Sequence, residues 1–115
     1  MIKHLVVSGG GTYCFQAFGA LMECHKKGIW NINNIESCYG TSVGVILLVM
    51  LVLKYQENEL TTYLVDRPWQ NVFKYEIYTI LNSFKENGFF GIDSFKQILS
   101  PLLSGMEMED NVTMQ

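Results

Sequence analysis

Five residues in the first half of the chain, Gly40-Thr41-Ser42-Val43-Gly44, form a G-x-S-x-G pattern between two different segments. The segment 35–39 before it predicts a short β-strand, and the nine apolar residues 45–53 after it predict a buried helix. A sharp strand-to-helix turn holds a serine in a strained backbone conformation with its hydroxyl exposed. The neighbours two residues away crowd each other in such a turn, which explains glycine at 40 and 44. The pattern favours an α/β fold with Ser42 as a nucleophile.

A second glycine cluster, Ser8-Gly9-Gly10-Gly11, follows the first apolar run at residues 5–7. Backbone N–H groups of such a loop can donate to an oxyanion, so Gly9, Gly10 and Gly11 are candidate oxyanion-hole residues. The N–H of Val43 is a further candidate, because the start of a helix favours negative charge. Together the two motifs predict serine acyl hydrolysis. The alternative is a tight turn in which Ser42 only caps the following helix.

The first half of the chain predicts the order strand, helix, strand, helix. Residues 3–8 predict a strand and residues 13–27 a helix, which Gly28 ends. One face of that helix carries Cys14, Ala17, Phe18, Leu21 and Cys24. This order is typical of a parallel sheet with covering helices.

The second half predicts helices alone. We expect one over 57–65, one carrying the apolar residues of 73–84, and one in which Ser94 and Gln97 resemble an N-terminal capping box. Asp93 is expected just before that last helix, Pro101 as a kink in it, and Gly105 at its end. Two strands make a poor sheet, so the sequence predicts the N-terminal part of a larger fold or a truncated relative of one.

Composition excludes several classes. The 115 residues suffice for one domain, and 49% hydrophobic residues exclude a disordered chain. A net charge of −3 argues against nucleic-acid binding. The spacing of the glycines argues against nucleotide binding, because the G-x-G-x-x-G motif needs glycine at the position of Cys14. No P-loop motif occurs in the sequence either.

The three cysteines, Cys14, Cys24 and Cys38, are an odd number without C-x-x-C spacing. This disfavours a disulfide framework and a zinc site, and it favours a reducing, cytoplasmic compartment. No signal peptide is evident, and segment 45–53 is short for a membrane span. Contact with membranes is expected to be peripheral, through Phe89-Phe90, unless this pair is a buried turn.

A catalytic base for Ser42 is hard to find in the sequence. A Ser-His-Asp triad needs a histidine, but His4 and His25 both precede Ser42, whereas histidine comes last in the α/β-hydrolase order. A serine–aspartate dyad remains, in which a carboxylate is the general base. The aspartates available are Asp66, Asp93 and Asp110, and each is better explained as a helix-end, cap or tail residue.

Residues 5–11, the helix 13–28 and the elbow 40–44 resemble the start of a patatin-like phospholipase, with weaker similarity at 91–93 and 110–113. The resemblance implies a three-layer α/β/α fold and a Ser-Asp dyad. It also implies hydrolysis of phospholipid and other lipid acyl esters through an acyl-enzyme, without metal or another cofactor. Carried onto this sequence, Ser42 is the nucleophile, and the N–H groups of Gly10 and Gly11 belong to the oxyanion hole.

Two departures from the family pattern stand out. Tyr13 and Cys14 occupy positions where the family has arginine and glycine, and no Asp-Gly-Gly or Asp-Gly-Ala motif occurs. We therefore expect residues 1–115 to be the N-terminal portion of a single patatin-like domain, namely its β-α-β-α start and the helices that follow. The predicted function is lipid acyl hydrolysis with the dyad aspartate outside this chain. The alternative is a catalytically inactive, truncated patatin-like module that binds lipid or protein.

Overall fold

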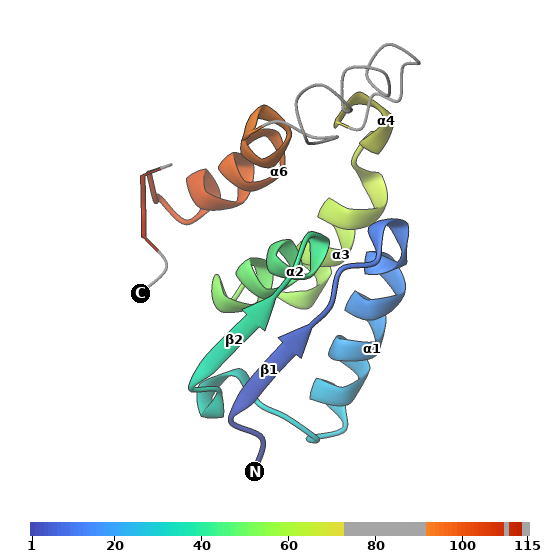
Figure 1. Cartoon of the computed structure of the whole chain (residues 1–115), viewed down its shortest axis with the longest axis vertical. Coiled ribbons are helices and arrows are strands. Elements are labelled where there is room, and N and C mark those ends of the chain that lie inside the picture. Colours follow the sequence, from blue (N-terminus) through green and yellow to red (C-terminus); the bar gives the residue numbers. More distant parts are fainter. Residues whose placement is uncertain (73–91, 110, 114–115) are drawn as a thin grey trace. The chain divides into compact units, whose positions relative to one another are not determined.

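The computed structural model describes residues 1–72, 92–109 and 111–113, which form two compact units, Met1–Val65 and Asp66–Gln115 (Figure 1). The first unit contains β1 (His4–Val7), η1 (Gly11–Tyr13), α1 (Cys14–Lys26), η2 (Ile32–Asn34), β2 (Ser37–Gly40), α2 (Val43–Val52) and α3 (Glu57–Asp66), whose last residue is counted in the second unit. The second unit contains α4 (Trp69–Val72) and α6 (Ile92–Gly105). The helix predicted over 73–84 and the turn at Phe89-Phe90-Gly91 lie outside the described residues.

The two strands pair in parallel, with His4 opposite Ser37 and Val7 opposite Gly40. In Figure 1 both arrowheads point the same way, so the segments that follow the two strands begin at the same edge of the sheet. The predicted order strand, helix, strand, helix is confirmed. The second strand begins later than predicted because η2 precedes it, and the side chain of Asn31 caps η2 by accepting the N–H of Asn33 at 2.9 Å.

The core of the first unit lies on one face of this sheet. Leu5 and Val7 are buried, and α2, which packs on both strands, buries Leu47 and Met50. The predicted inner face of α1 is confirmed, because Phe18 is buried and the other four residues of that face are half-buried. Within the first unit the opposite face of the sheet is open, and Val6 and Tyr39 are exposed on it.

Trp30 secures the connection after α1. Its side chain is buried, and its indole N–H donates to the carbonyl oxygen of Leu21 at 3.0 Å. Gly28 ends α1 as predicted: it has a φ of 70°, and its N–H donates to the carbonyl oxygen of His25. A positive φ is accessible to glycine at little cost, which is why this residue type suits the end of the helix.

The second unit corrects two predictions. The capping box of Ser94 and Gln97 is wrong, because α6 already begins at Ile92 and Ser94 lies inside it. Asp93 is likewise inside the first turn rather than before the helix, where its carboxylate complements the positive end of the helix dipole. The four-residue helix α4 was not predicted, because an element this short has no periodic pattern.

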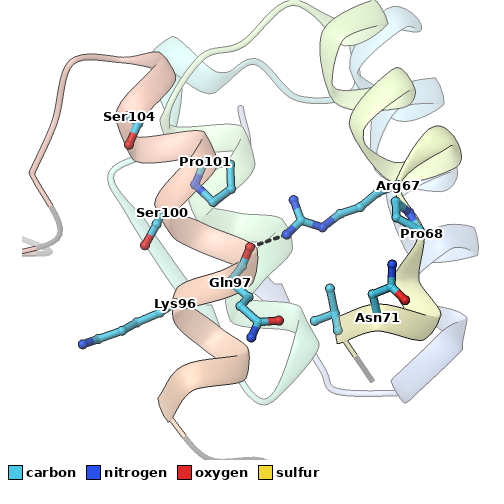
Figure 2. A pocket seen from close by; sticks show the side chains of 9 residues that line it. Arg67, Pro68, Asn71, Lys96, Gln97, Ser100, Pro101 and Ser104 are labelled. Carbon is cyan, nitrogen blue, oxygen red and sulfur yellow. Dashed lines mark hydrogen bonds between the residues drawn. The ribbon is translucent and has the colours of Figure 1, made fainter. Parts of the chain in front are cut away.

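Pro101 lies in the interior of α6 and has no N–H to donate to the carbonyl oxygen of Gln97, four residues earlier. The guanidinium group of Arg67 donates to that oxygen instead, as Figure 2 shows. The same guanidinium lies 5.5 Å from the centre of the Trp69 ring, in a cation–π arrangement. Arg67 therefore replaces the hydrogen bond that proline removes from the helix.

A double-mutant cycle tests this replacement. Arg67→Ala is expected to lower the free energy of unfolding by about 1 kcal/mol, since an exposed carbonyl group is partly compensated by water. In the Pro101→Ala background the new N–H of residue 101 satisfies Gln97, so the same substitution is expected to have a smaller effect. Urea denaturation of the unsubstituted protein, the two single variants and the double variant gives the coupling energy between positions 67 and 101. Purely additive effects would contradict the conclusion that Arg67 replaces the missing hydrogen bond.

Candidate active site

Ser42 stands between β2 and α2 with φ 52° and ψ −132°. A positive φ is uncommon for a residue with a side chain and stores strain. The turn is closed by two hydrogen bonds, from Gly44 N–H to the carbonyl oxygen of Thr41 at 2.9 Å and from Val45 N–H to that of Ser42 at 3.0 Å. The residue is exposed and its side chain makes no capping hydrogen bond. The structure thus has the strand-to-helix turn that the sequence predicted, and it does not support the capping alternative.

The two glycines of the elbow are required by close contacts. A Cβ atom on Gly40 would lie 2.9 Å from the backbone nitrogen of Val45 and 3.0 Å from the carbonyl carbon of Gly44. A Cβ atom on Gly44 would collide with the carbonyl oxygen of Val7 at the end of β1. The separations from the Val45 nitrogen and from the Val7 oxygen are shorter than real Cβ contacts allow, and the one from the Gly44 carbon is tighter than most of them. The glycines therefore crowd each other as predicted, and Gly44 also packs against the first strand.

The glycine loop after β1 lies against the elbow. A Cβ atom on Gly9 would be 2.8 Å from the Cβ of Ser42 and 3.6 Å from its Oγ. The N–H of Gly9 donates to the hydroxyl oxygen of Thr41 at 2.9 Å. The two motifs that the sequence singled out, 32 residues apart, are therefore in direct contact.

The candidate oxyanion donors differ in what they already bind. In the part of the chain that the structure describes, the N–H groups of Gly10, Gly11 and Val43 make no hydrogen bond to a protein acceptor. The N–H of Gly9 is already hydrogen-bonded to the hydroxyl oxygen of Thr41. The set of candidate oxyanion donors is therefore narrowed from four residues to the other three. What Gly9 contributes is the absence of a side chain beside Ser42.

Tyr13 and Cys14, which stand where the family has arginine and glycine, lie in a helical turn that leads into α1. The N–H of Tyr13 donates to the carbonyl oxygen of Gly10 at 3.1 Å, and that of Cys14 to Gly11, so the loop runs directly into α1. Tyr13 is exposed. Burial raises the pKa of the Cys14 thiol above its ordinary value, which disfavours the reactive thiolate form.

No base accompanies Ser42 in the first unit. The imidazole Nδ1 of His4 lies 2.7 Å from the Ser37 hydroxyl, at the other end of β2, and His25 packs on Trp30. Residues 1–65 contain no aspartate. Their four glutamates are engaged elsewhere: Glu23, Glu36 and Glu57 form ion pairs with lysines, and Glu59 accepts the N–H of Gln56. Within the part of the chain that the structure describes, nothing hydrogen-bonds the Ser42 hydroxyl.

The three aspartates of the chain lie elsewhere in the sequence. Asp66 ends α3 and Asp93 lies in the first turn of α6, and both are exposed. Asp110 is outside the described residues. The helix-end explanation of Asp66 agrees with its position, whereas Asp93 lies inside the first turn of α6 and not before the helix as a cap.

The second unit contains a groove without residues of either glycine motif. Figure 2 shows that Arg67 and Asn71 border it on one side and that Gln97 and Pro101 belong to α6, and its lining also includes Pro68, Val72, Lys96, Ser100 and Ser104. Across residues 1–72 and 92–109, no helix has both the length and the apolar character needed to cross a membrane.

Comparison with known proteins gives two matches. A family model described as patatin-like phospholipase matches residues 5–114. An uncharacterized protein, R571, of Acanthamoeba polyphaga mimivirus is 30% identical over 102 residues, which cover 89% of this chain and 34% of that protein. The chain thus spans about a third of the length of this relative. No solved structure matches.

Proposed function

The chain belongs to the patatin-like phospholipase family, and we propose that it carries the nucleophile and oxyanion donors of a serine lipid acyl hydrolase. The observation that carries this proposal is the geometry of Ser42. Its exposed side chain stands at a strained φ of 52°, and the backbone of Gly9 lies against it. A strained elbow of this kind is typical of an activated serine, whereas an ordinary helix cap needs neither the strain nor the second glycine loop.

The chemistry follows from the groups at this edge of the sheet. The Oγ of Ser42 attacks the ester carbonyl carbon, its proton passes to a carboxylate base, and a tetrahedral oxyanion forms. The N–H groups of Gly10, Gly11 and Val43 are the proposed donors to that oxyanion, and Val43 begins a ten-residue helix whose dipole favours negative charge.

Collapse of the tetrahedral species completes acyl transfer. The bond to the leaving alkoxide breaks, the alcohol takes the proton from the base, and the acyl group stays on Ser42. Water, deprotonated by the same base, then attacks the acyl carbon, the bond from that carbon to the Ser42 Oγ breaks, the Oγ takes the proton back from the base, and the fatty acid leaves. The base is proposed to be an aspartate outside these 115 residues, because residues 1–65 contain no aspartate and the sequence has no Asp-Gly-Gly or Asp-Gly-Ala motif.

The proposed substrate is a lipid acyl ester, with phospholipid as the main candidate, since the family is one of lipid acyl hydrolases. We propose that the protein acts in the cytoplasm and meets membranes at their surface. The Phe89-Phe90 pair expected to make that contact is outside the described residues.

Phosphatidylcholine vesicles test the proposal. The native polypeptide that carries these residues is expected to release free fatty acid and lysophospholipid, with no change in rate when EDTA removes divalent cations, because the proposed mechanism uses a carboxylate base and backbone donors. Mass spectrometry of the extracted lipids measures both products. If neither phospholipids nor short-chain esters are cleaved, the proposal fails and the alternative, an inactive lipid- or protein-binding module, replaces it.

A further inference from the structure

Thr41 uses all of its polar groups to join three segments around Ser42. Its N–H donates to the carbonyl oxygen of Val7 at 3.2 Å, which extends the β1–β2 pairing by one residue. Its carbonyl oxygen accepts the N–H of Gly44 at 2.9 Å, inside the elbow. Its hydroxyl oxygen accepts the N–H of Gly9 at 2.9 Å, from the glycine loop. The side chain of Thr41 is thus a link between the elbow and the glycine loop.

A loop made of Gly9, Gly10 and Gly11 needs such a link. It has no side chains to pack, and glycine has more backbone freedom to lose than any other residue. The Gly9–Thr41 hydrogen bond removes part of that freedom at the first residue of the loop. Gly9 also packs against the Cβ of Ser42, a contact that only a glycine permits.

We infer that Thr41 is a positioning residue of the active site, whose hydroxyl fixes Gly10 and Gly11 N–H groups relative to the Oγ of Ser42. This inference rests on the proposed function, because it assigns a role in oxyanion stabilisation. The two donors follow Gly9 directly in the chain, so the bond to Gly9 limits where they can lie. Displacement of catalytic groups by about 1 Å lowers rates by up to about 100-fold, so a loosened loop is expected to slow the formation of the oxyanion.

Two substitutions distinguish the effect of the Thr41 hydroxyl from the effect of the shape of its side chain. Thr41→Val keeps the branched side chain and removes the acceptor, whereas Thr41→Ser keeps the acceptor. The probe is an alkyl fluorophosphonate: Ser42 Oγ bonds to phosphorus, the P–F bond breaks, fluoride leaves, and the hydroxyl proton passes to the base. In the native polypeptide, Thr41→Val is expected to lower the phosphonylation rate constant by about 10- to 100-fold. Thr41→Ser is expected to stay within about threefold of the unmodified rate, since the acceptor is retained.

Amide hydrogen exchange of Gly9, followed by NMR, reports the bond without any chemistry at Ser42. We expect slow exchange in the unsubstituted protein and in Thr41→Ser, and fast exchange in Thr41→Val. If Thr41→Val exchanges fast at Gly9 but reacts at the unsubstituted rate, the positioning role is overturned while the proposed function stands. If Ser42 is not phosphonylated even without substitution, although Gly9 is protected, the proposed function fails and the inference fails with it.

Discussion

Replacing Ser42 with alanine is expected to abolish fatty-acid release by the native polypeptide, with a rate at least about 1,000-fold below that of the unsubstituted protein. Without the hydroxyl no acyl-enzyme forms, and the remaining oxyanion donors have no nucleophile to assist. The matched control is Ser37→Ala, which removes a serine hydroxyl from the opposite end of β2, and which is expected to leave the rate unchanged. Full activity in the Ser42→Ala protein would contradict the assignment of the nucleophile.

A second substitution at position 42 distinguishes the loss of the nucleophile from the relief of backbone strain. Ser42→Gly also removes the hydroxyl, but glycine adopts a φ of 52° without steric penalty. We expect this variant to be inactive and more stable to unfolding than Ser42→Ala by about 1 kcal/mol, which is the relief of strain less the greater chain entropy of glycine. Urea denaturation of both variants of the 115-residue chain measures the difference. Equal stability would mean that the elbow is not strained.

Gly44→Ala is expected to have the largest effect on the fold. The added methyl group would collide with the carbonyl oxygen of Val7 and lie 2.9 Å from its carbonyl carbon, so β1 or α2 has to move. Both partners are backbone atoms in regular elements, and neither can turn away as a side chain would. We expect the free energy of unfolding to fall by about 2–4 kcal/mol, in the upper range for single substitutions.

Gly19→Ala is the control for this substitution. Gly19 lies inside α1 and is exposed, and a Cβ atom there would meet nothing within 4 Å. Alanine in place of glycine in an open helical position stabilises by about 0.5–1 kcal/mol. The same chemical change is thus expected to have opposite signs at positions 19 and 44. A Gly44→Ala protein as stable as the unsubstituted chain would show that the elbow does not pack on β1 as described.

The elbow was predictable because its signals are local. Glycine at 40 and 44 is forced by a turn of five residues, and the strand before and the helix after it each have a clear pattern. The order of the first four regular elements was predictable for the same reason. The start of α6 was missed because Asp93 and Ser94 are residue types that often precede a helix, whereas here both lie inside α6, which begins at Ile92.

Contacts between distant residues were not predictable. The bond from Gly9 to Thr41 spans 32 residues, and it depends on the parallel register of the two strands. Arg67 meets Gln97 across 30 residues, and only the proline in α6 explains why that carbonyl group needs a donor. The sequence shows that Pro101 removes a hydrogen bond, but it does not show which residue supplies another.

The open face of the sheet bears on the prediction of a larger fold. Val6 and Tyr39 are paired across the strands on this face, and they are 76% and 59% exposed. Apolar residues this exposed in neighbouring strands are unusual for a parallel sheet, which is normally covered on both faces. The relative from Acanthamoeba polyphaga mimivirus is about three times as long as the matched region. These observations are consistent with the expectation of further strands and helices, which stays a prediction.

The most direct test of the account is the chemical identity of the residue that a fluorophosphonate modifies. The native polypeptide, captured from its source with an antibody against residues 1–65, is treated with the probe, digested and mapped by mass spectrometry. The account predicts one adduct, on the oxygen of Ser42, that is absent from the Ser42→Ala protein. An unmodified Ser42, or an adduct on another residue that persists in that variant, would contradict the claim that this elbow carries a catalytic nucleophile.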